Sequence, residues 1–403
     1  YVKSIKLWAD QYRGGSVPFD VINLHHYSND AGLQHAGATT GVSPEEDRLK
    51  EKLEEFVTYR NYYMPGKEIW LSEFGYDTNS GSAQRAPQIG GYTNAEVQGQ
   101  WLVRSYLAIA AAGIDKAQMF MLRDVNATDN TIFQSSGLTE SPSNQWAAKP
   151  SWYYVYTMKN RLMGMTFDSE VASGNEDVRI YKFVHADGDA AYAIWSPTAD
   201  GTTVSDYQLA LASGENQAVL VEMTEGDRDG VETALTLNSG NVSVDVSERP
   251  LFVLVNDGVE AIPKRYTLDE QIALTTDMVT IETGVGFADR LVDEQALVGN
   301  PDLGSTTPPV NIWISNGSVS SAYIDLGAEY DLTKIYLYDA VNTGNCTISI
   351  GTPGDWTPLF VDDLRYNGIW NAHVVDVTSR YVRVTMETAT SFVGEVAIYA
   401  TDD

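Results

Sequence analysis

The stretch KEIWLSEFG, residues 67–75, is the most informative part of this 403-residue chain. It follows a break at Pro65 and Gly66, has an apolar centre, and ends in Glu73, a phenylalanine and a glycine. This pattern predicts a short buried strand of a parallel sheet. A carboxylate at the carboxyl end of such a strand points into the crevice where ligands bind in parallel α/β folds. Glu73 is therefore a candidate catalytic residue.

The segments around this strand alternate between helix and strand patterns, which is typical of βα units. The helix after the strand is expected to begin at Thr93, because Thr93 and Glu96 have the spacing of a capping box. In chain order we expect a helix over 1–12, a strand over 19–28, a helix over 43–63, the strand over 67–75, a helix over 93–112 and a strand over 114–122.

Each of the three expected strands ends in side chains that ionise or form hydrogen bonds. These are His25, His26 and Tyr27 on the first strand, Glu73 on the second, and Arg123 and Asp124 on the third. Because the carboxyl ends of parallel strands lie at one edge, we expect these groups at a single rim. Three of these residues have a structural alternative. His26 is then a hydrogen-bonded structural residue, and Arg123 and Asp124 form a salt bridge at the rim.

From about residue 166 the pattern changes to period-two alternation with frequent turn signals, which predicts an antiparallel β-sandwich, followed by a second β-sandwich domain after the linker. The sequence ADGD, residues 186–189, is a candidate hairpin turn, and residues 257–268 are a plausible linker. The chain is thus expected to be multidomain, with domains over 1–165, 166–265 and 266–403.

Residues 1–165 resemble the last three βα units of a clan A glycoside hydrolase barrel. The segments that carry the resemblance are DVINLHHY (20–27), IWLSEFGYD (69–77), LRD (122–124) and KPSWYY (149–154). The resemblance implies the C-terminal half of a (β/α)8 barrel, with Glu73 as the nucleophile of a retaining glycosidase. It also implies that His25 and Tyr27 form the His-x-Tyr pattern of the sixth barrel strand, with the tyrosine near the nucleophile.

Two positions depart from the family pattern. Phe120 stands near the place where the family has a tryptophan under the bound sugar, and we expect it to substitute. The acid/base glutamate of the fourth barrel strand has no counterpart, so the resemblance implies that it lies outside this chain. We expect residues before Tyr1 to complete the barrel. The further sugar contacts expected at the rim are His25, His26, Tyr27, Tyr76, Arg123 and Asp124.

The C-terminal region resembles the discoidin, or coagulation-factor C-type, sandwich that is widely used as a carbohydrate-binding module. The segments that carry this resemblance are AYIDLGAEYDLTKIYLYD (322–339), SRYVRVTME (379–387) and GEVAIYA (394–400). By analogy, Asp293 and Glu395 are candidate ligands of a structural calcium ion, with capping or buried hydrogen bonding as the alternative. Trp313, in a polar segment, is the expected sugar-stacking indole, whereas Trp356 is expected in the core.

Composition narrows the possible partners. A net charge of −29 and an isoelectric point near 4.3 disfavour nucleic acids and anionic membranes. The chain has one cysteine, Cys346, and no apolar run long enough to span a bilayer. The two resemblances imply a secreted or cell-surface protein, of bacterial origin, that hydrolyses a polysaccharide. The alternatives are a non-catalytic glycan-binding or surface-assembly protein with a degenerate barrel, and an adhesion role for the C-terminal unit.

Overall fold

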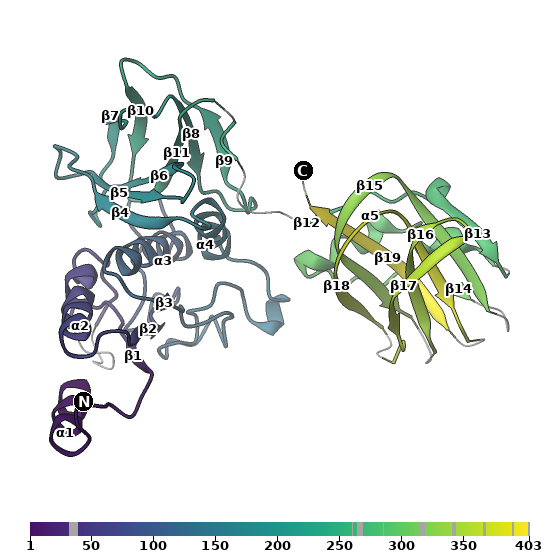
Figure 1. The fold of residues 1–403 in the computed structure, drawn as a ribbon, viewed down its shortest axis with the longest axis horizontal. Coiled ribbons are helices and arrows are strands. Elements are labelled where there is room, and N and C mark those ends of the chain that lie inside the picture. Colours follow the sequence, from purple (N-terminus) through teal and green to yellow (C-terminus); the bar gives the residue numbers. More distant parts are fainter. Residues whose placement is uncertain are drawn as a thin grey trace. The chain divides into compact units, whose positions relative to one another are not determined.

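The computed structural model divides the chain into two compact units, Tyr1–Tyr266 and Thr267–Asp403 (Figure 1). Each unit has a hydrophobic core of its own. No helix among the described residues is long and apolar enough to cross a membrane. The described residues are 1–31, 39–259, 261–263, 269–284, 286–314, 319–340, 344–365, 368–388 and 391–401.

A parallel sheet of three strands, in the order β1-β2-β3, forms the first part of the N-terminal unit. The expected strands and helices are present, although the helix expected from residue 43 begins at Leu49 and β3 is much shorter than the expected strand. The elements are α1 (Val2–Tyr12), β1 (Val21–His25), α2 (Leu49–Tyr63), β2 (Glu68–Glu73), α3 (Asn94–Ala111), β3 (Lys116–Ala117), η1 (Pro142–Asn144) and α4 (Pro150–Arg161). The predicted capping box is also confirmed, because Thr93 and Glu96 exchange hydrogen bonds at the start of α3.

Burial alternates along β2, so the two faces of the parallel sheet differ. Ile69 and Leu71 are buried, and Leu71 packs in one cluster with side chains of α2 and α3. Trp70 is only half-buried, and the Lys116 ammonium lies 4.4 Å from its ring centroid. The sheet of the described residues does not close into a barrel, so the expected half of a (β/α)8 barrel is not confirmed beyond these three βα units.

Antiparallel strands follow from residue 166 and share a core with the helices before them. Trp195 and Phe252 pack in one cluster with Val103 of α3 and Tyr154 of α4. Helices α3 and α4 thus lie between the parallel sheet and the larger antiparallel sheet (Figure 1). Residues 1–165 and 166–265 consequently belong to one compact unit.

The larger antiparallel sheet has six strands, in the order β4-β5-β6-β11-β8-β9, and β10 pairs with β7 beside it. The predicted hairpin turn at 186–189 is confirmed by the hydrogen bond from the His185 amide to the Asp189 carbonyl, 2.9 Å. The strands are β4 (Thr166–Glu170), β5 (Arg179–Val184), β6 (Ala190–Trp195), β7 (Val204–Ala210), β8 (Gln217–Glu222), β9 (Val231–Ala234), β10 (Asn241–Val246) and β11 (Leu251–Asn256).

The C-terminal unit is built on two long strands, β15 and β18, whose pairing register shifts twice along their length. Its strands follow the order β12-β19-β15-β18-β16-β17, with β13 on β15 and β14 on β19. The elements are β12 (Asp269–Gln271), η2 (Thr276–Met278), β13 (Val279–Thr283), η3 (Ala288–Leu291), α5 (Gln295–Val298), η4 (Pro301–Leu303), β14 (Trp313–Ile314), β15 (Ser320–Asp339), β16 (Cys346–Thr352), β17 (Asp355–Asp362), β18 (Ile369–Met386) and β19 (Phe392–Thr401).

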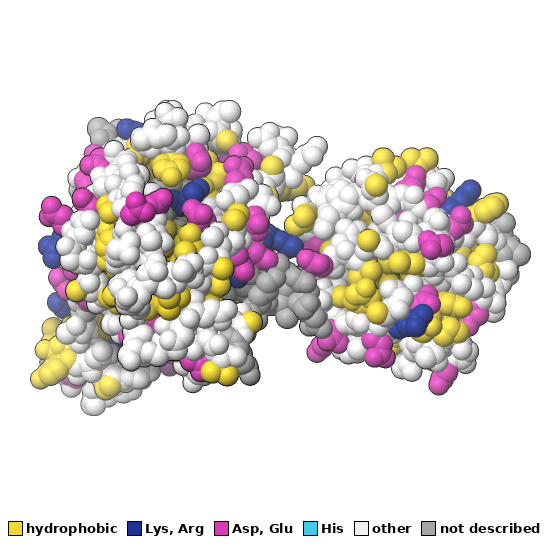
Figure 2. Space-filling model, turned by 90° about the horizontal axis from the view of Figure 1, so that it is seen from above, with side chains coloured by type: hydrophobic (Ala, Val, Ile, Leu, Met, Phe, Trp, Pro, Cys, Tyr) yellow, Lys and Arg dark blue, Asp and Glu magenta, His cyan; other side chains and the backbone are white. Residues whose placement is uncertain are grey.

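Acidic side chains are spread over the surfaces of both units. On the face drawn in Figure 2, Asp and Glu side chains are more widespread than Lys and Arg side chains. This distribution agrees with the net charge of −29. The charge is therefore a property of the general surface and does not mark one site.

Candidate active site

Glu73, at the carboxyl end of β2, faces two side chains from the end of β1. The parallel register pairs His25 with Glu73. The Tyr27 hydroxyl donates a hydrogen bond to Glu73 Oε2 at 3.0 Å, and His25 Nδ1 lies 3.3 Å from the same oxygen. No other described residue forms a hydrogen bond or ion pair with the carboxylate, whose side chain is 28% exposed. Oε2 is thus held in place while Oε1 is left free.

Tyr27 is suited to donate and not to accept. Its side chain is buried, and burial together with the hydrogen bond to Glu73 raises the pKa of the phenol above its usual value. The phenol therefore stays protonated at neutral pH and keeps its proton directed at Glu73. A neutral hydrogen-bond donor in this place stabilises the carboxylate and leaves its negative charge in place.

Two phenylalanines extend the aromatic surface beside Tyr27. The Phe133 ring lies 5.1 Å from the Tyr27 ring and 5.5 Å from the Phe120 ring, measured between centroids. Phe120 is half-buried, and its amide donates to the Phe74 carbonyl next to Glu73. The structure thus places Phe120 near Glu73, as expected, and adds Phe133, which the sequence analysis did not identify.

Asp77 holds the backbone of the segment that carries Phe133. Its carboxylate is fully buried and accepts hydrogen bonds from the Ser82 hydroxyl at 2.5 Å and from the amides of Phe133 at 3.0 Å and Ser135 at 3.3 Å. Burial raises the pKa of Asp77 despite these bonds. The only sequence signal for Phe133 is its place in the loop after the third strand, so its position depends on this long-range contact.

His26 is bound to a carboxylate from another segment. Its Nε2 lies 2.5 Å from Asp47 Oδ2, and the same carboxylate binds the Ser28 hydroxyl at 2.9 Å and Lys52 Nζ at 2.5 Å. Burial alone would raise the pKa of Asp47, but the bonds from His26 and Lys52 lower it. His26, whose side chain is 28% exposed, therefore has the hydrogen-bonded structural role that the sequence left open.

Asp124 and Tyr76 are corrections to the expected sugar contacts, because both are buried. Asp124 forms an ion pair with the buried Lys149 at 3.1 Å and accepts from the Gly137 amide at 2.7 Å. Its partner is thus not Arg123, which is exposed. Tyr76 is 2% exposed and packs edge-on against Trp101, with ring centroids 5.1 Å apart. Neither side chain can contact a bound sugar.

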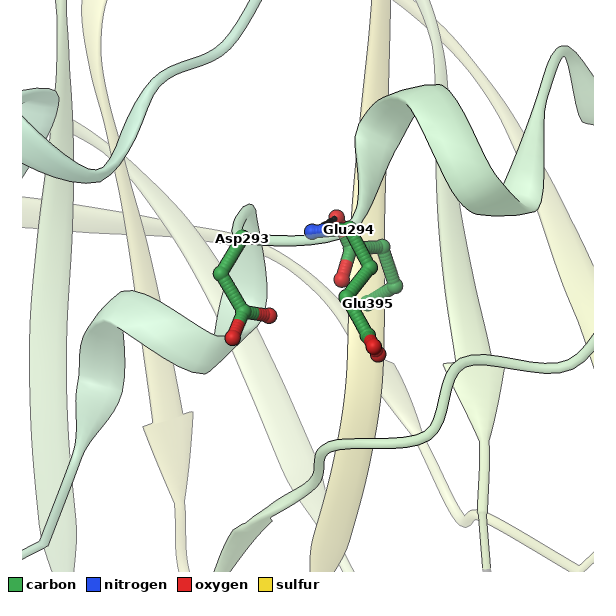
Figure 3. Close-up of side chains that lie close together, drawn as sticks. All are labelled: Asp293, Glu294 and Glu395. Atoms are coloured by element: carbon green, nitrogen blue, oxygen red, sulfur yellow. Dashed lines mark hydrogen bonds between the residues drawn. The ribbon is translucent and has the colours of Figure 1, made fainter.

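Three carboxylates meet in the C-terminal unit, where the sequence predicted two (Figure 3). Asp293, Glu294 and Glu395 each offer an oxygen, and these oxygens lie within 4.8 Å of one another. Glu294 was not identified from the sequence, although it directly follows Asp293. Such a set of oxygens is the donor type that calcium prefers.

Glu395 is the buried member of this carboxylate cluster. Its Oε1 accepts from Gln295 Nε2 at 2.6 Å and from the Glu294 amide at 3.2 Å, whereas its Oε2 is buried without a hydrogen-bond partner. Burial, and then the negative charges of Asp293 and Glu294, raise the pKa of Glu395 to about 8. An unsatisfied buried carboxylate oxygen among acidic neighbours fits a bound cation.

Trp313, the expected sugar-stacking indole, is 1% exposed and belongs to the core of the C-terminal unit. Trp313 lies on β14, which pairs with β19, and this pairing places the indole in the core although its neighbours in sequence are polar. The assignment of Trp313 as a sugar contact is therefore wrong. The expectation for Trp356 is also corrected, because this indole is half-buried and lies outside the core cluster.

Known proteins resemble this chain only in parts. No protein-family model and no curated protein sequence matches it. A family 39 glycoside hydrolase from the gut symbiont Bacteroides cellulosilyticus WH2 is similar over 52% of this chain and 37% of its own, with 19% identity and a TM-score of 0.36. CelM2, a bifunctional glucanase-xylanase from a metagenome library, is similar over 63% of this chain and 46% of its own, with 11% identity and a TM-score of 0.41.

A third similar structure matches a smaller part of this chain. Chitosan-binding module 1, derived from a chitosanase/glucanase of Paenibacillus sp. IK-5, is similar over 33% of this chain and 100% of its own, with 20% identity and a TM-score of 0.26. The solved structures that resemble parts of this chain thus include glycoside hydrolases and carbohydrate-binding modules. The chain spans less than half of the length of the two enzymes.

Proposed function

We propose that this chain carries the nucleophile of a retaining glycoside hydrolase that acts on a polysaccharide outside the cell or at its surface. The observation that supports the proposal is the arrangement at Glu73, where Tyr27 and His25 bind one carboxylate oxygen and leave the other free. A nucleophile needs this combination of a fixed orientation and an accessible oxygen.

The proposed reaction has two displacements at the anomeric carbon. First, Glu73 Oε1 forms a bond to this carbon while the bond to the leaving oxygen breaks, and an acid donates a proton to that oxygen. Second, water attacks the same carbon, gives its proton to the same group, and releases the Glu73 carboxylate. Two inversions give net retention. The Tyr27 hydroxyl steadies Oε2 while charge leaves the carboxylate and returns to it.

The acid/base group has to be a second carboxyl about 5–5.5 Å from the nucleophile. The carboxyls on nearby segments are unsuitable, because Asp47, Asp77 and Asp124 are buried and already engaged by other groups. We therefore propose that the acid/base group is a carboxyl other than these three. The half-buried rings of Phe120 and Phe133 supply an aromatic wall for the sugar.

We expect the chain to release dinitrophenolate from at least one member of a panel of dinitrophenyl glycosides, with retention of configuration. This leaving group departs without a proton, so the test does not depend on the acid/base group. Proton NMR of the first-formed sugar checks the configuration. An inverted product would contradict the nucleophile role. No release from any member of the panel would instead favour a non-catalytic glycan-binding protein.

We also propose that Asp293, Glu294 and Glu395 hold a calcium ion that stabilises the C-terminal unit. Calcium would supply positive charge to Glu395 Oε2, which is buried without a partner. At about 100 times its Kd, a bound ion adds about 2.7 kcal/mol of stability. We expect calcium to raise the Tm of the C-terminal transition relative to a chelator, as followed by calorimetry.

The Glu395→Gln variant should lose this calcium response, whereas Asp355→Asn, at the exposed start of β17, should keep it. Magnesium is expected to act weakly, because it prefers to keep its water ligands. If calcium leaves the Tm of the unmodified chain unchanged, the cluster is not a calcium site.

A further inference from the structure

The outer surface of the C-terminal unit carries a group of aromatic side chains that the sites described above do not use. Along β15 and β18, side chains point alternately to the two faces of the sheet. Ala322, Ile324, Val382 and Val384 are fully buried in the core. The residues between them, such as Tyr323, point to the opposite face and are half-exposed.

Strand pairing brings three aromatic residues together on this face. Tyr381 of β18 pairs with Gly351 of β16, and Gly351 in turn pairs with Trp356 of β17. The Tyr323 ring lies 5.7 Å from the Trp356 ring and 5.9 Å from the Tyr381 ring, measured between centroids. Because Gly351 has no side chain, the strand between Tyr381 and Trp356 adds nothing that would cover the rings. All three rings are half-buried.

Polar groups at the edge of the rings hold them in place. The Trp356 indole N–H donates to Glu282 Oε1 at 2.8 Å, and Arg383 Nε lies 2.6 Å from Glu282 Oε2. Arg383 Nη2 also donates to the Ser321 hydroxyl at 3.1 Å, and the guanidinium lies 5.7 Å from the Trp356 ring centroid. The indole is therefore fixed by a hydrogen bond and flanked by a planar donor.

The charges on this face are neutralised in pairs. Arg383 is paired with Glu282, and Arg380 binds Asp325 through two contacts of 2.7 and 2.9 Å. No cation of this group is thus free to meet an anionic ligand. The net charge of −29 on the chain further disfavours acidic polymers.

We propose that this aromatic face, defined by Tyr323, Trp356, Tyr381, Arg383 and Glu282, binds a neutral polysaccharide. The apolar C–H face of a pyranose stacks on an indole or phenol ring, and its hydroxyls hydrogen-bond to flanking charged groups. The inference rests on the proposed carbohydrate function but not on Glu73. Trp356, and not the buried Trp313, is then the indole that binds the sugar.

The test is affinity electrophoresis of the full chain carrying Glu73→Gln, which prevents hydrolysis during the run. The gels contain soluble β-glucan, xylan or alginate. We expect at least one neutral polymer to retard the chain and alginate to have little effect. Trp356→Ala and Tyr323→Ala should each weaken the retardation by about tenfold in Kd, whereas Trp356→Tyr, which keeps a ring, should lose less.

Trp370→Ala is the matched control, because this indole is half-buried in the same unit but packs against Tyr338, 5.3 Å between centroids. Its binding should be unchanged. The proposal is overturned if Trp356→Ala and Tyr323→Ala bind like the parent, if no neutral polymer retards the chain, or if alginate binds best. Retained binding without dinitrophenolate release would refute only the hydrolase, and release without binding would refute only the aromatic face.

Discussion

Replacing Glu73 with glutamine is expected to abolish covalent labelling of the chain by a fluorinated glycoside with a dinitrophenolate leaving group. The fluorine slows the second displacement, so the sugar stays attached to the nucleophile. An amide oxygen is a far weaker nucleophile than a carboxylate, and we expect the labelling rate to fall by about a thousandfold or more. Mass spectrometry of the intact chain measures the labelling, and peptide mapping locates it.

Glu68→Gln is the matched control for this variant. Glu68 lies on the same strand but at its other end, and its side chain is about half exposed. This variant should be labelled at the rate of the parent chain. Tyr27→Phe should slow labelling less than Glu73→Gln, because it removes one donor and keeps the nucleophile. A label on any peptide that lacks Glu73 would show that the nucleophile is a different residue.

Replacing Lys149 with methionine is expected to lower the free energy of unfolding of the N-terminal unit by about 3–5 kcal/mol. Lys149 and Asp124 are both almost fully buried, and Lys149 also donates to the Ser135 carbonyl at 3.1 Å. Burial raises the pKa of Asp124 and lowers that of Lys149, while their mutual attraction opposes both shifts. Without Lys149, a carboxylate remains buried with no cation. Urea unfolding measures the change.

The double variant Lys149→Met/Asp124→Leu should recover much of this stability, because it leaves no buried charge unpaired. Lys116→Met is the control for loss of a lysine. Its ammonium is 3.7 Å from Glu68, and both side chains are about half exposed, so the expected cost is below about 1 kcal/mol. A Lys149→Met chain no less stable than Lys116→Met would show that the buried pair does not hold this region together.

The strand ends at the candidate active site could be predicted because they depend on local pattern and one general rule. Short apolar runs marked β1 and β2, and parallel strands bring their carboxyl ends to one edge. His25, Tyr27 and Glu73 therefore meet as expected. Phe133 could not be predicted, because its place depends on the contact between its amide and Asp77, 56 residues away.

The partners of two side chains at the same edge were also not predicted, for a common physical reason. His26 and Asp124 resemble site residues in sequence, but each is paired with a group from another segment, Asp47 in one case and Lys149 in the other. Residues of the same type can line a cleft or satisfy a buried partner. The choice between these roles depends on which distant segment packs against them.

The two tryptophans of the C-terminal unit show the same limit. Trp313 has polar sequence neighbours but is buried, because β14 pairs with β19 over the core. Trp356 was expected in the core, but it lies on the outer face beside Tyr323 and Glu282. Local polarity did not indicate burial in either case, since burial of a strand residue depends on which face of the sheet it occupies.

The amino-acid sequence alone was sufficient for the order of helices and strands over residues 1–122, the capping box at Thr93 and the position of Glu73 at a strand end. These features depend on residues within about one turn or one strand, where periodicity and capping act. Only the tertiary structure decided which groups surround Glu73 and which carboxylate joins Asp293 and Glu395. It also decided which indole of the C-terminal unit reaches solvent. Those contacts join residues far apart in sequence, and no local pattern specifies them.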